Sequence, residues 1–407
     1  MSSADLKHED QCVILVGGRG TRLGALTEAT PKPLLPVAGR PFLDHLVFEA
    51  HRHGFRRFLL LAGYRGDALT FAAEAMTRKY PDATIDVVIE PEPLGTGGAV
   101  RYAAGRLADE FLLLNGDSLF DINLLDLVAR PVDGPWAAKI ALKPGQDPAR
   151  YGTVITDGER VVQFREKSPS AERVTINGGV YWLKKSVVSR ISPGPISLER
   201  DIFPKLAEAG LMRGYVYDRF LLDIGIPDSL AAAETLVPRQ TRRGAVFFDR
   251  DGVLNEDHGY VHRREEFQWK PEAIQAVKRA NDSGRFAFVV TNQAGVARGY
   301  YSESDVLELH AWMNADLRGH GAHIDAFAYC PHHPDGVIEK YRAVCECRKP
   351  QPGMITALMA DWSVDSANSF LLGDRNTDIA AAVAAGVSGY LIGAQSVAEI
   401  MLTAGSQ

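Results

Sequence analysis

Ala245-Val-Phe-Phe-Asp249-Arg-Asp251-Gly-Val-Leu-Asn255 is the most informative stretch in this chain of 407 residues. An apolar run of strand character ends in two carboxylates, with one residue between them and a glycine after them. One carboxylate can attack a phosphate while the other transfers protons. A calcium loop is the alternative, but it needs glycine at its sixth position and further oxygen ligands at regular spacing. The stretch therefore predicts a phosphoryl-transfer site at the end of a strand.

Three further motifs follow in an order that suits phosphate chemistry. A second apolar run, from Phe286, ends in Thr291-Asn292-Gln293, whose hydroxyl and amides can hold phosphate oxygens. Arg348-Lys349 supplies fixed positive charge, and Leu371-Leu-Gly-Asp374 ends a third run in a carboxylate suited to Mg²⁺. Open α/β sheets bind ligands at the carboxyl ends of their parallel strands, so these motifs predict one shared site.

On these motifs, residues 245–407 resemble the haloacid dehalogenase superfamily of phosphatases. The resemblance implies a three-layer α/β/α domain with Asp249 as the nucleophile and Asp251 as the acid/base. It implies that Thr291 and Lys349 hold the phosphoryl oxygens. The Mg²⁺ ligands expected in this half are Asp249, Asp251 and Asp374; Asp378 is a weaker candidate, for which a helix cap is an equal alternative.

Three of the four cysteines gather in Cys330-Pro-His332-His333 and Cys345-Glu-Cys347. Three thiolates and an imidazole form a closed tetrahedral Zn²⁺ site, and a closed site is structural because it leaves no position for substrate. We expect this zinc loop to fix the segment that presents Arg348 and Lys349. Either histidine of the pair can complete the site.

The zinc loop, the segment Asn255-Glu-Asp-His258-Gly-Tyr260 and residues 291–299 together resemble heptose 1,7-bisphosphate 7-phosphatases. Histidinol-phosphate phosphatases have a similar zinc loop, so the motifs leave the substrate open. In the resembled family the first histidine binds the metal, which gives Cys330, His332, Cys345 and Cys347 as zinc ligands. Four residues are expected to bind the sugar phosphate: His258, Asn292, Gln293 and Arg348.

The first half carries a glycine-rich loop. After the strand-like run 11–16 comes Gly17-Gly-Arg-Gly-Thr-Arg-Leu23, followed by Pro31-Lys32-Pro33. Successive backbone N–H groups in such a loop form an anion-binding concavity. A dinucleotide site would need an acidic residue on a second strand, but Asp44 lies in a segment with helical periodicity, and no Walker lysine follows the loop. Arg22 and Lys32 suit a triphosphate and a departing pyrophosphate instead.

Residues 11–235 resemble the sugar-1-phosphate nucleotidyltransferase family, through the glycine loop, the base-recognition loop 91–98 and four later motifs, which are Leu112–Asp117, Phe164–Lys167, Asn177–Gly179 and Leu221–Gly225. The resemblance implies Mg²⁺ on Asp117 and Asp223, and Arg22 and Lys32 as catalytic residues. The nucleotide-binding residues expected are Gly17, Gly18, Gly20, Thr21, Arg22, Glu92, Gly95, Thr96 and Gly97. The sugar-phosphate-binding residues expected are Gly152, Glu166, Lys167, Asn177 and Gly178.

Length and composition fit two α/β domains. We expect a flexible segment 1–10, a Rossmann-like transferase domain 11–237, a linker 238–244 and the phosphatase domain 245–407. A net charge of −6 argues against nucleic acid as a partner, and no apolar run reaches the length of a membrane span. Few cysteines, of which Cys12 is expected in the core, suit the cytoplasm. A homo-oligomer stays open.

The two chemistries form a sequence of reactions. A sugar 1,7-bisphosphate that loses its distal phosphate becomes a sugar 1-phosphate, which the first domain can join to a nucleotide. By resemblance the sugar is a heptose and the nucleotide donor is GTP, so the products are GDP-heptose and pyrophosphate. Two alternatives remain: the same reactions on a cyclitol such as valienol 1,7-bisphosphate, or a nucleotide-sugar sensor with one inactive half.

Overall fold

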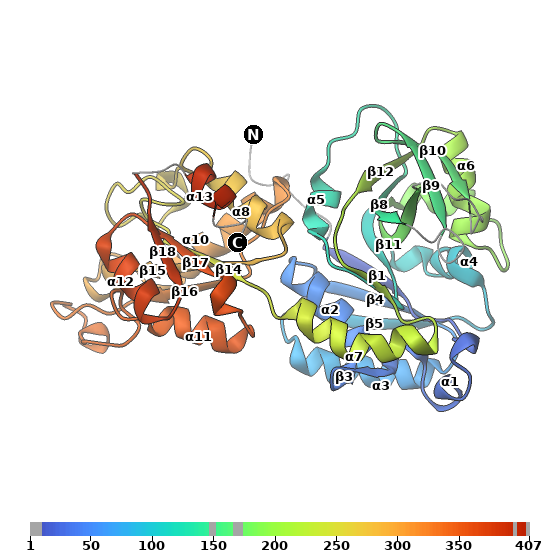
Figure 1. Ribbon diagram of the computed structural model, residues 1–407, viewed down its shortest axis with the longest axis horizontal. Coiled ribbons are helices and arrows are strands. Elements are labelled where there is room, and N and C mark those ends of the chain that lie inside the picture. The colour runs from blue at the N-terminus through green and yellow to red at the C-terminus, as the bar shows by residue number, and fades with distance from the viewer. Residues whose placement is uncertain (1–9, 146–151, 166–173, 394–396, 404–407) are drawn as a thin grey trace. The chain divides into compact units, whose positions relative to one another are not determined.

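The structure is a computed structural model that describes residues 10–145, 152–165, 174–393 and 397–403. The chain divides into two compact units, Met1–Pro238 and Arg239–Gln407 (Figure 1). Of the segment expected to be flexible, residues 1–9 lie outside the described residues. The expected linker 238–244 begins inside helix α7 (Pro227–Thr241), which continues past Pro238 although proline cannot donate the usual helix hydrogen bond.

A nine-stranded mixed sheet forms the centre of the first unit. Four strands run parallel in the order β5-β4-β1-β6, and the pairings beyond them are mainly antiparallel. In spatial order the strands are β5 (Thr84–Ile89), β4 (Arg57–Ala62), β1 (Gln11–Leu15), β6 (Glu110–Asn115), β11 (Val174–Lys184), β8 (Ala138–Gly145), β12 (Met212–Val216), β10 (Arg160–Arg165) and β9 (Thr153–Asp157).

Both faces of this sheet are covered by helices. Along β1, Cys12 and Ile14 pack into one core with α2, α3, α5 and α7, whereas Val13 packs into the opposite core with α4 and α6. Successive side chains of a strand point to opposite faces, so an uninterrupted apolar strand requires this double cover. The helices are α1 (Leu26–Ala29), α2 (Phe42–Arg52), α3 (Gly66–Lys79), α4 (Gly95–Tyr102), α5 (Leu124–Ala129) and α6 (Phe203–Glu208).

Asp44 lies on helix α2, as its periodicity predicted. Its carboxylate is buried and pairs with Arg40 at 3.1 Å and with Lys79 at 2.7 Å. Asp44 is therefore a structural residue, and the acidic strand end that a dinucleotide site would need is not supplied by it.

The second unit is built on five parallel strands in the order β16-β15-β14-β17-β18. Within β14, Val246 and Phe248 face a core with α8, α10 and α13, while Ala245 and Phe247 face a core with α11 and α12. The predicted three-layer α/β/α fold is confirmed. The elements are β14 (Ala245–Phe248), β15 (Phe286–Asn292), β16 (Ala326–Cys330), β17 (Phe370–Gly373), β18 (Ser388–Leu391), α8 (Ala273–Asp282), α9 (Ala294–Ala297), α10 (Glu303–Gly319), α11 (Gly353–Asp361), α12 (Asn376–Ala384) and α13 (Val397–Thr403).

Short elements complete both units. Two small ribbons pair β2 (Pro36–Val37) with β3 (Arg40–Pro41), and β7 (Ser118–Phe120) with β13 (Leu221–Asp223). Single turns of helix are η1 (Thr21–Leu23), η2 (Lys32–Leu34), η3 (Ala104–Arg106), η4 (Lys185–Arg190), η5 (Leu198–Ile202), η6 (Arg264–Glu266), η7 (Glu339–Tyr341) and η8 (Ser366–Asn368). Within the described ranges, no helix has the length and apolar character needed to cross a bilayer.

Candidate active sites

Three adjacent parallel strands gather the phosphate motifs of the second unit. Strands β15, β14 and β17 are neighbours in register, so their carboxyl ends meet at one edge of the sheet. Asp249 follows β14, Thr291 lies near the end of β15, and Asp374 follows β17. The structure thus brings together side chains that are far apart in the sequence, at the edge where α/β sheets bind ligands.

Lys349 lies at the centre of this charged group. Its ammonium lies 2.8 Å from Asp249 Oδ1 and 2.7 Å from Asp378 Oδ1, and it donates to Val290 O at 2.8 Å. Burial raises the pKa of Asp249 to about 7, and the neighbouring ammonium acts in the opposite direction. Burial alone would lower the pKa of Lys349, but the two carboxylates outweigh it and raise that pKa. Lys349 is therefore a fixed cation beside Asp249.

Asp251 is held by three side chains. Arg250, which is fully buried, donates Nη2 to Asp251 Oδ1 and Oδ2 at 2.9 and 3.0 Å. Gln293 Nε2 donates to Oδ2 at 2.9 Å, and Asn255 Nδ2 donates to Oδ1 at 3.1 Å. Both of its oxygens accept hydrogen bonds, and Asp251 lies outside the carboxylate cluster described next; its expected role as a Mg²⁺ ligand stays a prediction.

The carboxylate cluster consists of Asp249, Asp374 and Asp378, whose ligand atoms lie within 4.8 Å of one another. Asp374 Oδ1 is buried and has no hydrogen-bond partner among the described residues, and burial raises the pKa of this residue. A buried acceptor without a partner is unfavourable unless a cation binds it, and oxygen donors suit Mg²⁺. Asp378 also caps α12 by accepting from Arg375 N at 3.0 Å, so its two expected roles are compatible.

Asn292 and Arg348 have structural partners. Asn292 Nδ2 donates to Lys349 O at 3.1 Å, and Asn292 Oδ1 accepts from Lys349 N at 3.0 Å. This pair of hydrogen bonds fixes the backbone that carries the lysine, and the expected contact of Asn292 with a sugar phosphate stays a prediction. Arg348 is half-buried, and its Nη1 donates to His332 O at 3.2 Å.

Gln293 also has protein partners. Its side chain is buried, and its Nε2 donates both to Asp251 Oδ2 and to the Thr291 hydroxyl, each at 2.9 Å. Its Oε1 accepts from the Tyr301 hydroxyl at 2.6 Å. These contacts make Gln293 a support of Asp251, and its expected contact with a sugar phosphate stays a prediction.

His258 is exposed and lines a cavity of about 580 Å³. Tyr260 and Tyr300 line the same cavity, and their rings meet edge to face at 4.8 Å. The guanidinium of Arg298 lies 5.9 Å from the Tyr260 ring, and its Nε is buried without a hydrogen-bond partner in the described part of the chain. Arg298 is not itself among the residues that line the cavity, whereas Glu265 and Glu266 are.

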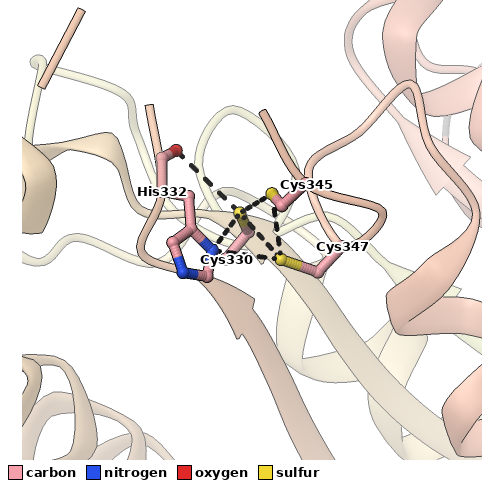
Figure 2. A group of neighbouring side chains, drawn as sticks. All are labelled: Cys330, His332, Cys345 and Cys347. Atoms are coloured by element: carbon pink, nitrogen blue, oxygen red, sulfur yellow. Dashed lines mark hydrogen bonds between the residues drawn. The ribbon is translucent and has the colours of Figure 1, made fainter. Parts of the chain in front are cut away.

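Cys330, His332, Cys345 and Cys347 point toward one another in the zinc loop (Figure 2). The sulfur atoms are 3.2 to 3.5 Å apart, and His332 Nδ1 lies 3.4 Å from the Cys347 sulfur. Tetrahedral zinc with Zn–S bonds of about 2.3 Å requires sulfur separations of about 3.8 Å, so a small expansion fits the ion. The group contains His332 and not His333.

In the first unit, a cavity of about 460 Å³ opens where β1 and β6 end. The glycine loop forms one side of it and the segment 90–96 forms another. Gly20 has a φ of 64°, a left-handed conformation that favours glycine, and it leads into the turn that carries Thr21. The expected site residues that line the cavity are Gly17, Gly18, Lys32, Glu92, Gly95, Thr96 and Asp117.

Four charged side chains approach one another beside this cavity. Lys32 Nζ lies 2.6 Å from Asp117 Oδ2. Strand β13 pairs with β7, which places Asp223 opposite Ser118, the residue after Asp117. A Cβ atom built on Gly225 would lie 3.1 Å from Arg22 Nη2, 3.3 Å from Lys32 Nζ and against Asp223 Oδ1. Two carboxylates together with substrate phosphates suffice for Mg²⁺, so this group fits the ion.

Two glycines of the loop 91–98, Gly95 and Gly97, pack closely against the backbone of Ile196. A Cβ atom on Gly95 would lie 2.7 Å from Ile196 O, and Gly97 N already donates to Ile196 O at 2.8 Å. The Thr96 hydroxyl donates to Glu199 Oε2 at 2.7 Å and accepts from Leu198 N at 2.8 Å. These contacts fix the loop, and the nucleotide contacts expected of Gly97 and of Thr96, which lines the cavity, stay predictions.

Asn177 and Gly178 form an irregular turn in β11. Asn177 N donates to Gly152 O at 2.9 Å, and its side chain contacts Gly179 N and the Tyr181 hydroxyl. A Cβ atom on Gly178 would collide with the ring of Phe120. These residues shape the floor beside Asn115 at the end of β6, while Glu166 and Lys167 lie outside the described residues.

A family model described as Nucleotidyl transferase matches residues 11–240, more than half of the chain. The chain belongs to the nucleotidyl transferase family. A D-glycero-alpha-D-manno-heptose 1-phosphate guanylyltransferase of Aneurinibacillus thermoaerophilus is 34% identical over 226 residues, which are 55% of this chain and 96% of the relative. The solved structure of HddC from Yersinia pseudotuberculosis complexed with GMP-PN is 30% identical and covers 56% of this chain and 99% of its own, with a TM-score of 0.48.

The second unit of this nucleotidyl transferase belongs to a phosphatase family. A HAD-hydrolase-like family model matches residues 346–402. A D-glycero-beta-D-manno-heptose-1,7-bisphosphate 7-phosphatase of Rhodopseudomonas palustris is 48% identical over 149 residues, which are 37% of this chain and 83% of the relative. The chain is therefore an enzyme that joins a nucleotidyltransferase to a phosphatase.

Glu90 is a residue of the transferase site that sequence reasoning missed. It lines the cavity, and its Oε2 is buried without a hydrogen-bond partner in the described part of the chain. Burial raises the pKa of Glu90. The Glu90 carboxylate packs against Gly17 and Gly63. A Cβ atom would lie 3.1 Å from Glu90 Oε1 if it were built on Gly17, and 2.5 Å from it if it were built on Gly63. The signal was present in the sequence, as an acidic residue at the end of a strand directly before the base-recognition loop.

Proposed function

We propose that this enzyme catalyses two consecutive reactions. The phosphatase unit hydrolyses the 7-phosphate of D-glycero-α-D-manno-heptose 1,7-bisphosphate. The transferase unit then joins the heptose 1-phosphate to GMP from GTP, which gives GDP-heptose and pyrophosphate. The observation that supports the proposal is that one chain joins a unit similar to a heptose 1,7-bisphosphate 7-phosphatase to a unit similar to a heptose 1-phosphate guanylyltransferase.

The two relatives differ in the anomer of their substrates. The phosphatase relative is named for the β-bisphosphate and the transferase relative for the α-phosphate. Hydrolysis at carbon 7 leaves carbon 1 untouched. Consecutive reactions therefore require both units to accept one anomer. We assign the α anomer, since the transferase joins the nucleotide directly to the anomeric phosphate and so contacts this centre most closely.

In the phosphatase unit, Asp249 attacks the phosphorus of the 7-phosphate, and the bond to the sugar oxygen breaks. Asp251 gives a proton to the departing oxygen and later takes one from the water that hydrolyses the aspartyl-phosphate. Lys349 and the Thr291 hydroxyl hold the phosphoryl oxygens. Asp249, Asp374 and Asp378 would hold Mg²⁺, which when bound neutralises phosphate charge.

In the transferase unit, an oxygen of the sugar 1-phosphate attacks the α-phosphorus of the nucleoside triphosphate, and pyrophosphate leaves in line. Arg22 and the N–H groups of the glycine loop stabilise the departing pyrophosphate. Lys32, whose ammonium approaches the same point beside Gly225 as Arg22, neutralises phosphate charge. Asp117 and Asp223 would hold Mg²⁺, which when bound screens the charge on the reacting phosphates.

Glu90 supports guanine as the base. Guanine presents two adjacent donors, the N1–H and the amino group on carbon 2, which match the two oxygens of a carboxylate. Adenine places an acceptor beside its amino group, and that acceptor would repel a carboxylate. We predict that Glu90→Gln lowers the preference for GTP over ATP by about tenfold or more, because one of the two acceptors is lost. Unchanged kcat/KM ratios for the four triphosphates would contradict this role.

Arg298 and Arg348 support a bisphosphate as the phosphatase substrate. Ala297 O accepts from Ile338 N at 3.0 Å, so the segments that carry the two arginines are in contact. A monophosphate needs only the charges around Asp249, whereas a second phosphate needs a further cation, and we assign this role to the two guanidinium groups. The substrates are small molecules in the cytoplasm, where GTP is available.

The decisive experiment incubates the purified chain with each anomer of the heptose 1,7-bisphosphate and all four triphosphates. Mass spectrometry should detect GDP-heptose from the α anomer alone. Equal turnover of the four triphosphates would overturn the guanine assignment, and faster hydrolysis of valienol 1,7-bisphosphate would favour the cyclitol. A chain with neither activity would support the sensor hypothesis.

A further inference from the structure

To transfer a proton, the Asp251 carboxylate must face the leaving oxygen in a defined orientation. Neighbouring side chains must supply this orientation, because the aspartate side chain can rotate. In this structure its carboxylate accepts five hydrogen bonds from three side chains. Arg250 supplies three of them at 2.9, 3.0 and 3.1 Å. Gln293 and Asn255 supply the other two. The carboxylate is thus held on both oxygens.

These donors are themselves held in place. Arg250 is fully buried and also donates Nη2 to Val261 O at 2.6 Å. Gln293 is anchored at its other atom by the Tyr301 hydroxyl, and the Tyr301 ring stacks on His262 at 4.7 Å with an interplanar angle of 11°. The support therefore extends from the loop before α8 to the segment after α9.

We infer that Arg250 and Gln293 are positioning residues that orient Asp251 for proton transfer in the phosphatase reaction, with Tyr301 fixing Gln293. This inference rests on the proposed function of the second unit. Neither residue transfers the proton or contacts the phosphate. Their effect arises because a rotated carboxylate would present its oxygen to the leaving group at a poorer distance and angle.

The proposal predicts a dependence on the leaving group. A sugar alkoxide is a poor leaving group and needs a proton as its bond to phosphorus breaks, whereas p-nitrophenolate leaves without one. Gln293→Met keeps the size of the side chain but removes the amide. We expect kcat/KM for the sugar phosphate to fall about ten- to hundredfold, a part of the usual contribution of general acid catalysis. For p-nitrophenyl phosphate we expect a change of less than about threefold.

The measurement is kcat/KM because it reports the steps up to release of the alcohol and excludes the later hydrolysis of the aspartyl-phosphate. Tyr301→Phe provides a second, milder variant that retains the ring and loses only the hydroxyl. We expect the same pattern with a smaller loss, and KM for the sugar phosphate within about twofold of the wild-type value in both variants.

Asn281→Leu is the matched control. Asn281 is a buried amide of the same unit that makes two hydrogen bonds to the backbone of His323, at 2.9 and 3.1 Å, outside the active site. It should lower stability but affect both substrates equally. If Gln293→Met and Tyr301→Phe also reduced both rates in parallel, the positioning role would be overturned and the proposed function would stand. A wild-type chain without activity on any phosphate monoester would overturn both.

Discussion

The two active sites differ in how much of their charge is buried. In the phosphatase unit, Asp249, Thr291 and Lys349 are nearly inaccessible, at 7%, 1% and 4% exposure. In the transferase unit, Arg22 is exposed and Asp117 keeps a third of its side chain in solvent. The phosphatase site is organised before substrate arrives, whereas the transferase site relies on its substrates to complete the arrangement of charges.

The difference follows from the size of the ligands. A phosphoryl group is small, so a few buried side chains can surround it, and their low-dielectric setting strengthens each interaction. A nucleoside triphosphate and a sugar phosphate are large and must enter and leave through an open cavity. We therefore expect substitutions in the phosphatase site to change stability as well as rate, and substitutions in the transferase site to change mainly rate.

The largest expected effect separates the two activities completely. Asp249→Asn removes the nucleophile and should lower phosphate release by about 10⁴-fold or more, while pyrophosphate formation from heptose 1-phosphate stays within twofold. Asp117→Asn should do the reverse. Both activities are measured on the same preparation of each variant, and a variant that loses both would show that the sites are not independent.

Loss of Arg22 tests whether exposed charge matters in the transferase site. Arg22→Ala should lower the rate of pyrophosphate release by about 10²-fold, as for other donors that stabilise a leaving group. Its melting temperature should stay within a degree or so of the wild-type value, because an exposed side chain contributes little stability. Arg78→Ala, another exposed arginine of this unit, provides the control that changes neither quantity.

Zinc removal tests the claim that the phosphatase site is prearranged. Cys347→Ser or chelation should lower phosphatase activity about tenfold or more, because the loop that carries Lys349 loses its anchor. Zinc content by atomic emission should fall from one ion per chain to none. Transferase activity should persist, and its loss would argue against separate folding of the two units.

The smallest expected effect concerns acid stability of the second unit. His310 is 3% exposed, and burial lowers its pKa to about 3. Between that value and the ordinary value of about 6.5, the unfolded chain binds a proton that the folded chain does not. The free energy of unfolding should therefore fall by up to about 1.4 kcal/mol for each pH unit below 6.5. His310→Phe should flatten this part of the curve in urea titrations, and an unchanged slope would refute the assignment.

Much of both sites could be predicted because the sequence places polar residues directly after apolar strands. The strand ends at Asp249, Thr291 and Asp374 converge as expected, since parallel strands align their carboxyl ends. The clustering of three cysteines and a histidine was visible from their spacing, and the structure places His332, not His333, in this group.

The directions of side chains could not be predicted in the same way. The contact of Gln293 with Asp251 joins residues 42 positions apart, and no local pattern reports it. The sequence also did not predict the contact between Asp378 and Lys349. In the structure Asp378 both caps α12 and pairs with Lys349.

All four cysteines are unpaired thiols, and their distribution has a chemical consequence. Cys12 is enclosed in the core of the transferase unit, whereas the three others depend on their thiolate form to hold a metal. Peroxide would therefore reach the phosphatase unit first. Under oxidising stress we expect the bisphosphate to accumulate while preformed sugar 1-phosphate is still converted. The first reaction would stop, and the second would continue until its sugar 1-phosphate is used up.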